Sequence, residues 1–164
     1  MRIRIYAIIL LIIPAAATYA QNNKPYFTVE GEVQKPLTLT TEALSGFTQV
    51  EVTAKDRDGN EHLFTGVRLA DILDSAGVTL GGELRGENLA KYVLVRAVDG
   101  YEVIFSLPEI DPEFTDQTIL LAYQMDGKPL PRGEGPFRIV APKDKKHARW
   151  IREINTIRIV FSKE

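Results

Sequence analysis

From residue 26 onward the chain is dominated by strand-like segments, in which apolar and polar positions alternate or β-branched residues predominate. A period of two is typical of a strand that buries one face. The pattern predicts strands over residues 26–33, 48–53, 62–64, 92–98, 101–107, 118–124, 137–141 and 154–161. Asp58-Gly59-Asn60 and Asp99-Gly100 each separate two of these segments, and such dipeptides favour tight turns. We therefore expect two β-hairpins.

Helical spacing is confined to short segments. Thr40 can cap a helix that begins with residues 41–44. Residues 69–76 place their apolar side chains on one helical face, and Gly77 is a suitable stop. Residues 86–91 can hold one more turn. Because the helices are short and do not alternate regularly with strands, the sequence predicts an α+β fold with a mixed or antiparallel, β-rich sheet.

The first twenty residues have the composition of a secretory signal. Arg2 and Arg4 precede an apolar run over residues 5–13, and small residues lead up to Ala20. A membrane span needs about 20 apolar residues, so an uncleaved anchor is the less favoured alternative. We expect cleavage after Ala20 and one domain over residues 21–164. That domain would be periplasmic or secreted and not inserted in a membrane.

Composition narrows the possible functions. The chain has no cysteine, and an exported protein without disulfides suits a bacterial periplasm. Its net charge of −2 would become −4 after loss of Arg2 and Arg4, which gives no reason to expect nucleic acid as a partner. His62 and His147 are far apart and belong to no ligand-spaced cluster, so a zinc site is not expected. No Gly-x-Ser-x-Gly sequence supports a hydrolase.

Four segments together resemble a known family. They read PLTLTTEALSGFTQVEVT (36–53), FTGVRLADILDSAGV (64–78), DGYEVIFSLPE (99–109), and a closing stretch over 119–154 with LLAYQMDGKPLP, GPFRIVAP and ARWIREI. In this order and spacing they resemble the molybdopterin-binding domain of the sulfite oxidase family. The resemblance implies that family's β-rich fold and, in its enzymes, a molybdenum pterin that serves in oxidoreductase chemistry.

The chain departs from that family at its functional positions. The resemblance implies a molybdenum-ligating cysteine just after the second strand, where this chain has Asp56. A carboxylate is a harder ligand and a poor substitute for a thiolate. Glu134-Gly135 stands in place of a His-Gly pair, and Asp144 replaces a glycine that lies near the pterin phosphate. We therefore expect no bound cofactor and no protein-held metal, with molybdopterin as the alternative.

A basic segment surrounds Trp150. Lys146 and Arg149 match the basic pair that the family directs at the pterin phosphate. Several cations in one loop can bind phosphate, sulfate or carboxylate through charge-assisted hydrogen bonds. The candidate anion-binding residues are Lys143, Lys145, Lys146, His147, Arg149 and Arg138. The alternative is a solvated basic loop. We expect Trp150 to pack beneath this loop, and Tyr101 and Tyr123 to form pocket walls.

The sequence favours an exported, non-catalytic binding or accessory module whose ligand is a small anion or a partner protein. The first alternative is a molybdopterin-dependent oxidoreductase that binds its cofactor without a cysteine. The second is a structural subunit of a larger redox complex. The family's enzymes acquire the cofactor before export, usually behind a twin-arginine signal. Arg2-Ile3-Arg4 is not such a signal, which supports the cofactor-free reading.

Overall fold

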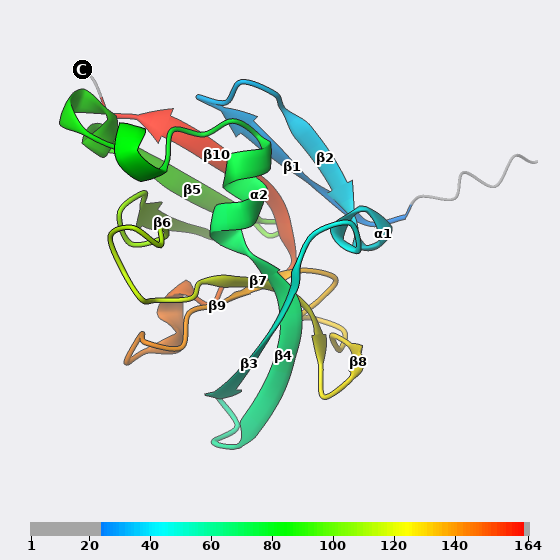
Figure 1. Cartoon of the computed structure of the whole chain (residues 1–164). Coiled ribbons are helices and arrows are strands. Elements are labelled where there is room, and N and C mark those ends of the chain that lie inside the picture. The colour runs from blue at the N-terminus through cyan, green and yellow to red at the C-terminus, as the bar shows by residue number, and fades with distance from the viewer. Residues whose placement is uncertain (1–23, 163–164) are drawn as a thin grey trace, which may run out of the picture.

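The computed structural model describes residues 24–162, so the predicted signal over residues 1–20 lies outside the described part. Two sheets form the structure (Figure 1). The first contains, in spatial order, β2 (Leu37–Thr40), β1 (Tyr26–Gly31), β10 (Ile154–Phe161), β5 (Lys91–Ala97) and β6 (Glu102–Ser106). The second contains β3 (Gln49–Lys55), β4 (Glu61–Arg68), β7 (Leu120–Met125) and β8 (Lys128–Pro129), with β9 (Arg138–Val140) also paired to β7.

Helices are few and short among the described residues. The α-helices are α1 (Thr41–Leu44) and α2 (Leu69–Ser75), and 3-10 turns lie at Gly81–Glu83, Gly86–Ala90 and His147–Arg149. Strands β1 and β10 pair in parallel, whereas the other described strand pairs are antiparallel. The predicted α+β, β-rich fold is therefore confirmed.

Both predicted hairpins are present. Strands β3 and β4 pair through the turn after Asp56, and β5 and β6 pair across Asp99-Gly100. The first strand ends at Gly31, earlier than predicted. Its φ is +92°, and a Cβ there would lie 2.1 Å from the Ile159 carbonyl oxygen. Strand β4 instead continues to Arg68, because buried residues extend it along β7. Local patterning therefore located the hairpins but not every strand end.

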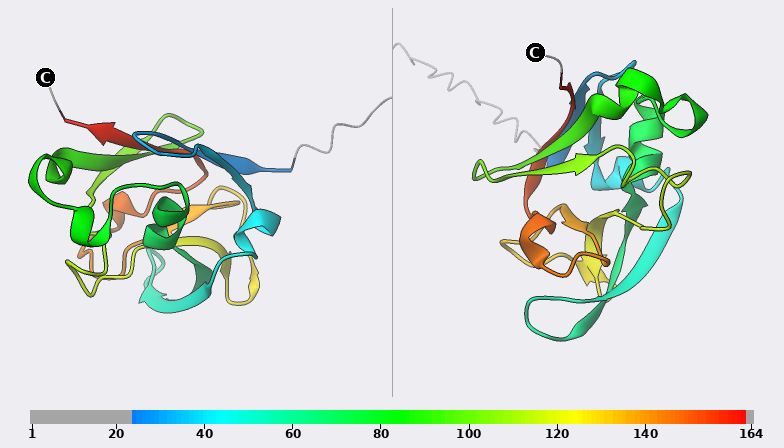
Figure 2. Two further views of the ribbon diagram at one scale, coloured as in Figure 1. Left: turned by 45° about the horizontal axis from the view of Figure 1, so that its top comes forward. Right: turned by 90° about the vertical axis from the view of Figure 1, so that its left-hand side faces the viewer.

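The core lies between the two sheets and against α2. Figure 2 shows β1 and β10 in one layer and the second sheet in the other. Phe27 and Phe137 meet edge to face across this core, with ring centroids 4.9 Å apart. Leu69, Ile72 and Leu73 are fully buried on one face of α2, as the helical spacing predicted. No helix among residues 24–162 is long and apolar enough to cross a membrane.

The β3–β4 hairpin projects from the body of the molecule (Figure 1). His62, near its tip, bonds to Asp126 and to Asp58. The His62 Nδ1 lies 2.6 Å from an Asp126 carboxylate oxygen, and Nε2 lies 3.0 Å from an Asp58 oxygen. These bonds raise the pKa of His62 to about 9, so the imidazolium persists at neutral pH. Asp126 also accepts the Leu63 N–H at 2.9 Å. The hairpin is therefore joined to the turn that follows β7.

Close backbone approach between β4 and β7 depends on Gly66. A Cβ at this position would lie 2.1 Å from the Leu121 carbonyl oxygen and 2.7 Å from the Ala122 Cα. We expect Gly66→Ala to lower the free energy of unfolding by about 3 kcal/mol, since backbone must move to relieve the overlap. Urea denaturation measures this. Gly82→Ala is the control, because a Cβ there meets nothing within 4 Å. Equal losses in both variants would contradict the close-approach explanation.

Candidate functional site

Asp56 occupies the first position after β3, where the resemblance implies a metal-ligating cysteine. Its backbone N–H donates to the Asn60 carbonyl at 2.9 Å, which closes the hairpin turn. Its carboxylate accepts the Arg57 N–H at 2.8 Å. The residue is only 7% exposed, so the carboxylate points into the protein and not into solvent. A buried carboxylate requires a compensating charge.

Arg138 provides that charge from the first position of β9. Its Nη1 lies 2.8 Å from Asp56 Oδ2 and its Nη2 lies 3.2 Å from Oδ1, a two-point ion pair in which the guanidinium is fully buried. Glu134 also accepts from Nη1, and Arg152 lies 3.3 Å from the other Glu134 oxygen. Two carboxylates and two guanidinium groups therefore alternate in one charge-balanced cluster.

Aromatic rings complete the surroundings of Arg138. The guanidinium carbon lies 5.1 Å from the Phe64 ring centroid and 5.6 Å from that of Trp150. Both distances are within the range of cation–π attraction. Trp150 is itself held by a 3.0 Å hydrogen bond from its indole N–H to the Ala141 carbonyl. The ion pair is therefore packed between rigid side chains.

The ion pair decides whether Asp56 can replace a thiolate ligand. Burial raises the pKa of Asp56, but hydrogen bonds from Arg138 and from the Arg57 N–H outweigh this effect and leave the pKa below its usual value. Both oxygens of the ionised carboxylate already accept hydrogen bonds. Residues 24–162 contain no group of three or more His, Cys, Asp or Glu placed to hold a metal. These donors do not fit molybdenum ligation by the protein.

Arg149 has carboxylate partners of its own. It donates to both Asp144 oxygens, at 2.9 and 2.7 Å, and to Glu109 at 3.0 Å. These bonds raise the pKa of Arg149 above its usual value, the Asp144 bonds most strongly. The guanidinium also lies over Phe105, 4.5 Å from the ring centroid, and donates to the Ile104 carbonyl of β6 at 3.3 Å. Arg149 therefore braces the loop against β6.

Asp144 has a different role from the one its sequence position suggested. The resemblance places it where a glycine lies near the pterin phosphate, but here its carboxylate binds Arg149 at two points. Glu109 contributes a second negative charge to the same guanidinium. The charge of Arg149 is thus already compensated within the protein. An anion that bound here would have to compete with two carboxylates.

The other predicted anion-binding residues are distributed along the loop. Lys143, Lys145 and Lys146 are exposed. His147 is turned toward the hairpin, where its Nε2–H donates to the Lys55 carbonyl at 2.7 Å. Arg57 in turn donates to the His147 carbonyl at 3.2 Å. The structure therefore separates three solvent-exposed lysines from three residues with structural contacts. Arg138 and His147 bind the hairpin, and Arg149 binds Glu109 and β6.

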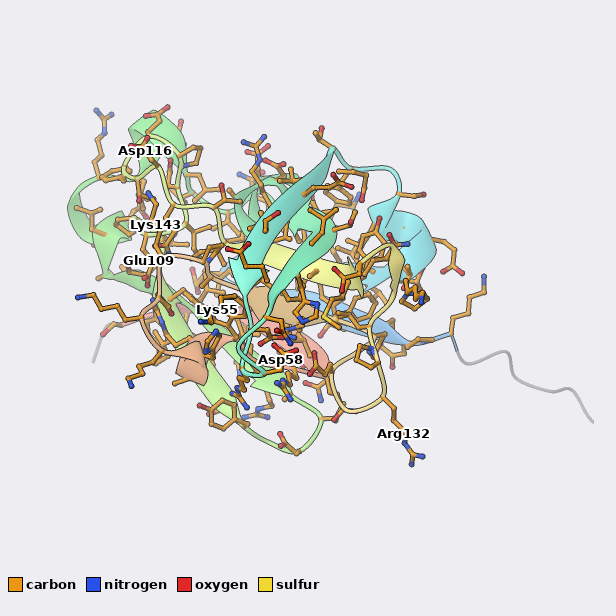
Figure 3. The ribbon with its side chains drawn as sticks, turned by 90° about the horizontal axis from the view of Figure 1, so that it is seen from below. Lys55, Asp58, Glu109, Asp116, Arg132 and Lys143 are labelled. Carbon is orange, nitrogen blue, oxygen red and sulfur yellow. The ribbon has the colours of Figure 1, made fainter. Side chains whose placement is uncertain are left out.

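An open groove of about 670 Å³ lies between the hairpin and the basic loop. Its walls include Asp56, Gly59, Glu61, Asp144, His147 and Trp150, and its cations are Lys55, Arg57 and Lys145. Figure 3 shows Lys55 and Asp58 near the hairpin tip, with Lys143 and Glu109 on neighbouring segments. Lys55 and Arg57 were not among the sequence candidates. In the sequence, only their position on either side of Asp56 indicated that these two residues could belong to the site.

The aromatic predictions have separate outcomes. Trp150 is 2% exposed beneath the loop, as expected. Tyr101 lines a second hollow of about 340 Å³ with Trp150 and Arg152, and its hydroxyl donates to the Ala148 carbonyl at 2.9 Å. Tyr123 donates to the Gln49 side-chain oxygen, and burial raises its pKa. Tyr101 is thus a pocket wall, whereas Tyr123 fastens β7 to the start of β3.

Removing one member of the buried Asp56–Arg138 pair should lower the free energy of unfolding substantially. In Asp56→Ala, Arg138 would keep Glu134 but lose its two-point partner, and breaking a buried ion pair costs about 3–5 kcal/mol. We expect chemical denaturation to show a loss of this size. Glu102→Ala is the control, since it breaks an exposed pair with Arg96 that is worth about 0–1 kcal/mol. A loss in Asp56→Ala as small as in the control would show that the pair is not structural.

Comparison with known proteins agrees with this fold. The family model described as oxidoreductase molybdopterin binding domain matches residues 15–163. No curated protein matches the chain. The crystal structure of the sulfane dehydrogenase SoxCD from Paracoccus pantotrophus is similar, with a TM-score of 0.66 and 20% identity. The match covers 84% of this chain but only 38% of that one, so the likeness concerns the fold. The chain therefore belongs to the oxidoreductase molybdopterin-binding domain family.

Proposed function

We propose that this protein is an exported, non-catalytic binding or accessory module that has kept the molybdopterin-binding fold without the chemistry of its cofactor. The observation that carries the proposal is the Asp56–Arg138 ion pair at the position of the expected metal ligand. A carboxylate whose two oxygens are held by a buried guanidinium has little capacity left to coordinate a metal. The export signal and a periplasmic location belong to the same proposal.

The ligand we propose is a small anion or a partner protein that contacts the groove between the hairpin and the basic loop. Lys55, Arg57 and Lys145 bring three cations to its walls. Three carboxylates also line the groove. Asp56 and Asp144 are each paired with an arginine, and Glu61 lies opposite Lys55 in the β3–β4 ladder. The three cations therefore outnumber the carboxylate that no arginine offsets, and they set the sign of the potential that an incoming ligand meets.

The second candidate is a molybdopterin-dependent oxidoreductase that binds its cofactor without a cysteine. The family assignment favours it, as does the open groove directly beside Asp56. The occupied Asp56 carboxylate and the Arg149–Asp144 contact oppose it. The first leaves little capacity to bind a metal, and the second compensates the charge of an arginine that the resemblance directs at the pterin phosphate. The simplest way to distinguish the two candidate functions is to measure the molybdenum content of the protein.

We expect protein purified from its native host to contain no stoichiometric molybdenum. The reason is that no thiolate is available and Asp56 is engaged by Arg138. Elemental analysis by mass spectrometry measures this directly, together with the absorption spectrum. A content near one molybdenum per chain would reject the proposal and favour the oxidoreductase.

Anion binding should depend on the free lysines of the groove and not on Arg149. We expect millimolar phosphate or sulfate to raise the Tm of the wild type, because a ligand that binds only the folded state stabilises it. The double variant Lys55→Ala with Lys145→Ala should lose most of this shift, and added salt should weaken it.

Lys35→Ala with Lys128→Ala is the matched control, since it removes the same charge outside the residues that line the groove. The variant Arg149→Ala is a poor test, because it also removes the contacts to Asp144, Glu109 and Ile104. If neither anion shifts the Tm of the wild type, the basic loop is a solvated surface and the small-anion proposal fails.

A further inference from the structure

Strand β3 is a free edge of the second sheet. Its one strand partner among the described residues is β4, and Asp56 and Asn60 form a hydrogen-bonded pair at the hairpin end. In an antiparallel ladder such pairs alternate, so the backbone groups of Glu51 and Thr53 point away from β4. The Lys55 carbonyl obeys the same rule, because it faces outward to accept from His147. An exposed row of this kind is a template for another strand.

Strand β6 is an edge of the first sheet, and side chains already bond to its outward backbone groups. On β6, Arg149 donates to the Ile104 carbonyl at 3.3 Å, and Glu109 accepts the Ser106 N–H at 2.6 Å. These side chains occupy the backbone groups that an added strand would use. No comparable side-chain bond reaches Glu51 or the Thr53 backbone within residues 24–162. On β3 the corresponding bond among the described residues is the one from His147 to the Lys55 carbonyl, so the outward backbone groups of Glu51 and Thr53 remain available to another strand.

The free edge leads directly into the cationic groove. Thr53, Ala54 and Lys55 line the groove, with Arg57 and Lys145 beyond them. A chain that paired with β3 would therefore reach three cations as it passed Lys55. Pairing through the backbone supplies affinity in such complexes, and side-chain chemistry at particular positions supplies specificity.

We propose that β3 binds an extended segment of a partner protein, which adds as an antiparallel strand and places acidic residues in the groove. Antiparallel pairing puts the N-terminal end of that segment beside Lys55. The charges of Glu51 and Lys55 on the strand disfavour indiscriminate pairing and select a complementary register. The inference rests on the proposed function, because a cofactor in the groove would occupy the place of the acidic residues.

The probe is a six-residue peptide, acetyl-Asp-Asp-Val-Thr-Val-Thr-amide, added to the full chain as purified. We expect the peptide to shift the amide NMR signals of Glu51, Thr53 and Lys55 and to leave those of β6 unchanged. The matched control peptide replaces both aspartates with lysine. We expect it to bind at least about tenfold more weakly, because opposite charges at Lys55, Arg57 and Lys145 become like charges.

Two variants, Thr53→Pro and Lys145→Ala, separate the contributions of backbone pairing and of charge to the affinity for the peptide. Thr53→Pro removes one outward N–H without removing a bond to β4, and proline is tolerated on edge strands. This change should weaken binding of the acidic peptide by about tenfold. Thr53→Val, which keeps the N–H, is its control. Lys145→Ala should weaken the acidic peptide severalfold, whereas Lys128→Ala should not.

The outcomes are distinct. If Thr53→Pro fails to fold, the pattern of amide shifts in the wild type still decides the question. The β3 amide signals could fail to shift at millimolar peptide concentration in protein that lacks molybdenum. That result would overturn the strand-addition proposal and leave the proposed function intact. Stoichiometric molybdenum would instead overturn the proposed function, and with it the acidic half of this inference.

Discussion

The buried ion pair between Asp56 and Arg138 is the interaction on which the rest of the site depends. Burying either charge alone would cost several kcal/mol, so each residue constrains the position of the other. Asp56 directly follows β3 and Arg138 begins β9, so the pair joins the projecting hairpin to the strand on the opposite side of β7 from β4. Phe64 and Trp150 then pack on the same guanidinium. At the position where the resemblance implies a metal ligand, this chain therefore has a structural contact.

The same change of role extends to the basic loop. Arg149 is bonded to Asp144 and Glu109 and covers the edge of β6, while His147 and Arg57 hold the loop to the hairpin. The groove that remains has lysines as its unpaired cations and a free strand along one side. This combination supports the proposal of a charged, extended partner, because the groove is open and its charges are carried by flexible side chains.

The sequence predicted the fold well because its strongest signals are local. Asp99-Gly100 and the 69–76 helical face depend on residues within one turn or one helix, and both appear where expected. The long-range partners of Arg138 and Arg149 were missed for the opposite reason. Asp56 lies 82 residues from Arg138, and Glu109 lies 40 from Arg149, so only the sheet topology brings them together. Glu134 and Asp144 lie four and five residues from the same arginines, but the sequence does not show that their side chains turn toward them.

The central claim is that an ion pair occupies the place of the metal ligand. It is tested most directly by a crystal structure of the protein from its native host, with diffraction recorded on both sides of the molybdenum absorption edge. The account predicts no anomalous peak in the groove and both Asp56 oxygens on Arg138, as described above. An anomalous peak within bonding distance of Asp56, with Arg138 displaced from it, would contradict the account.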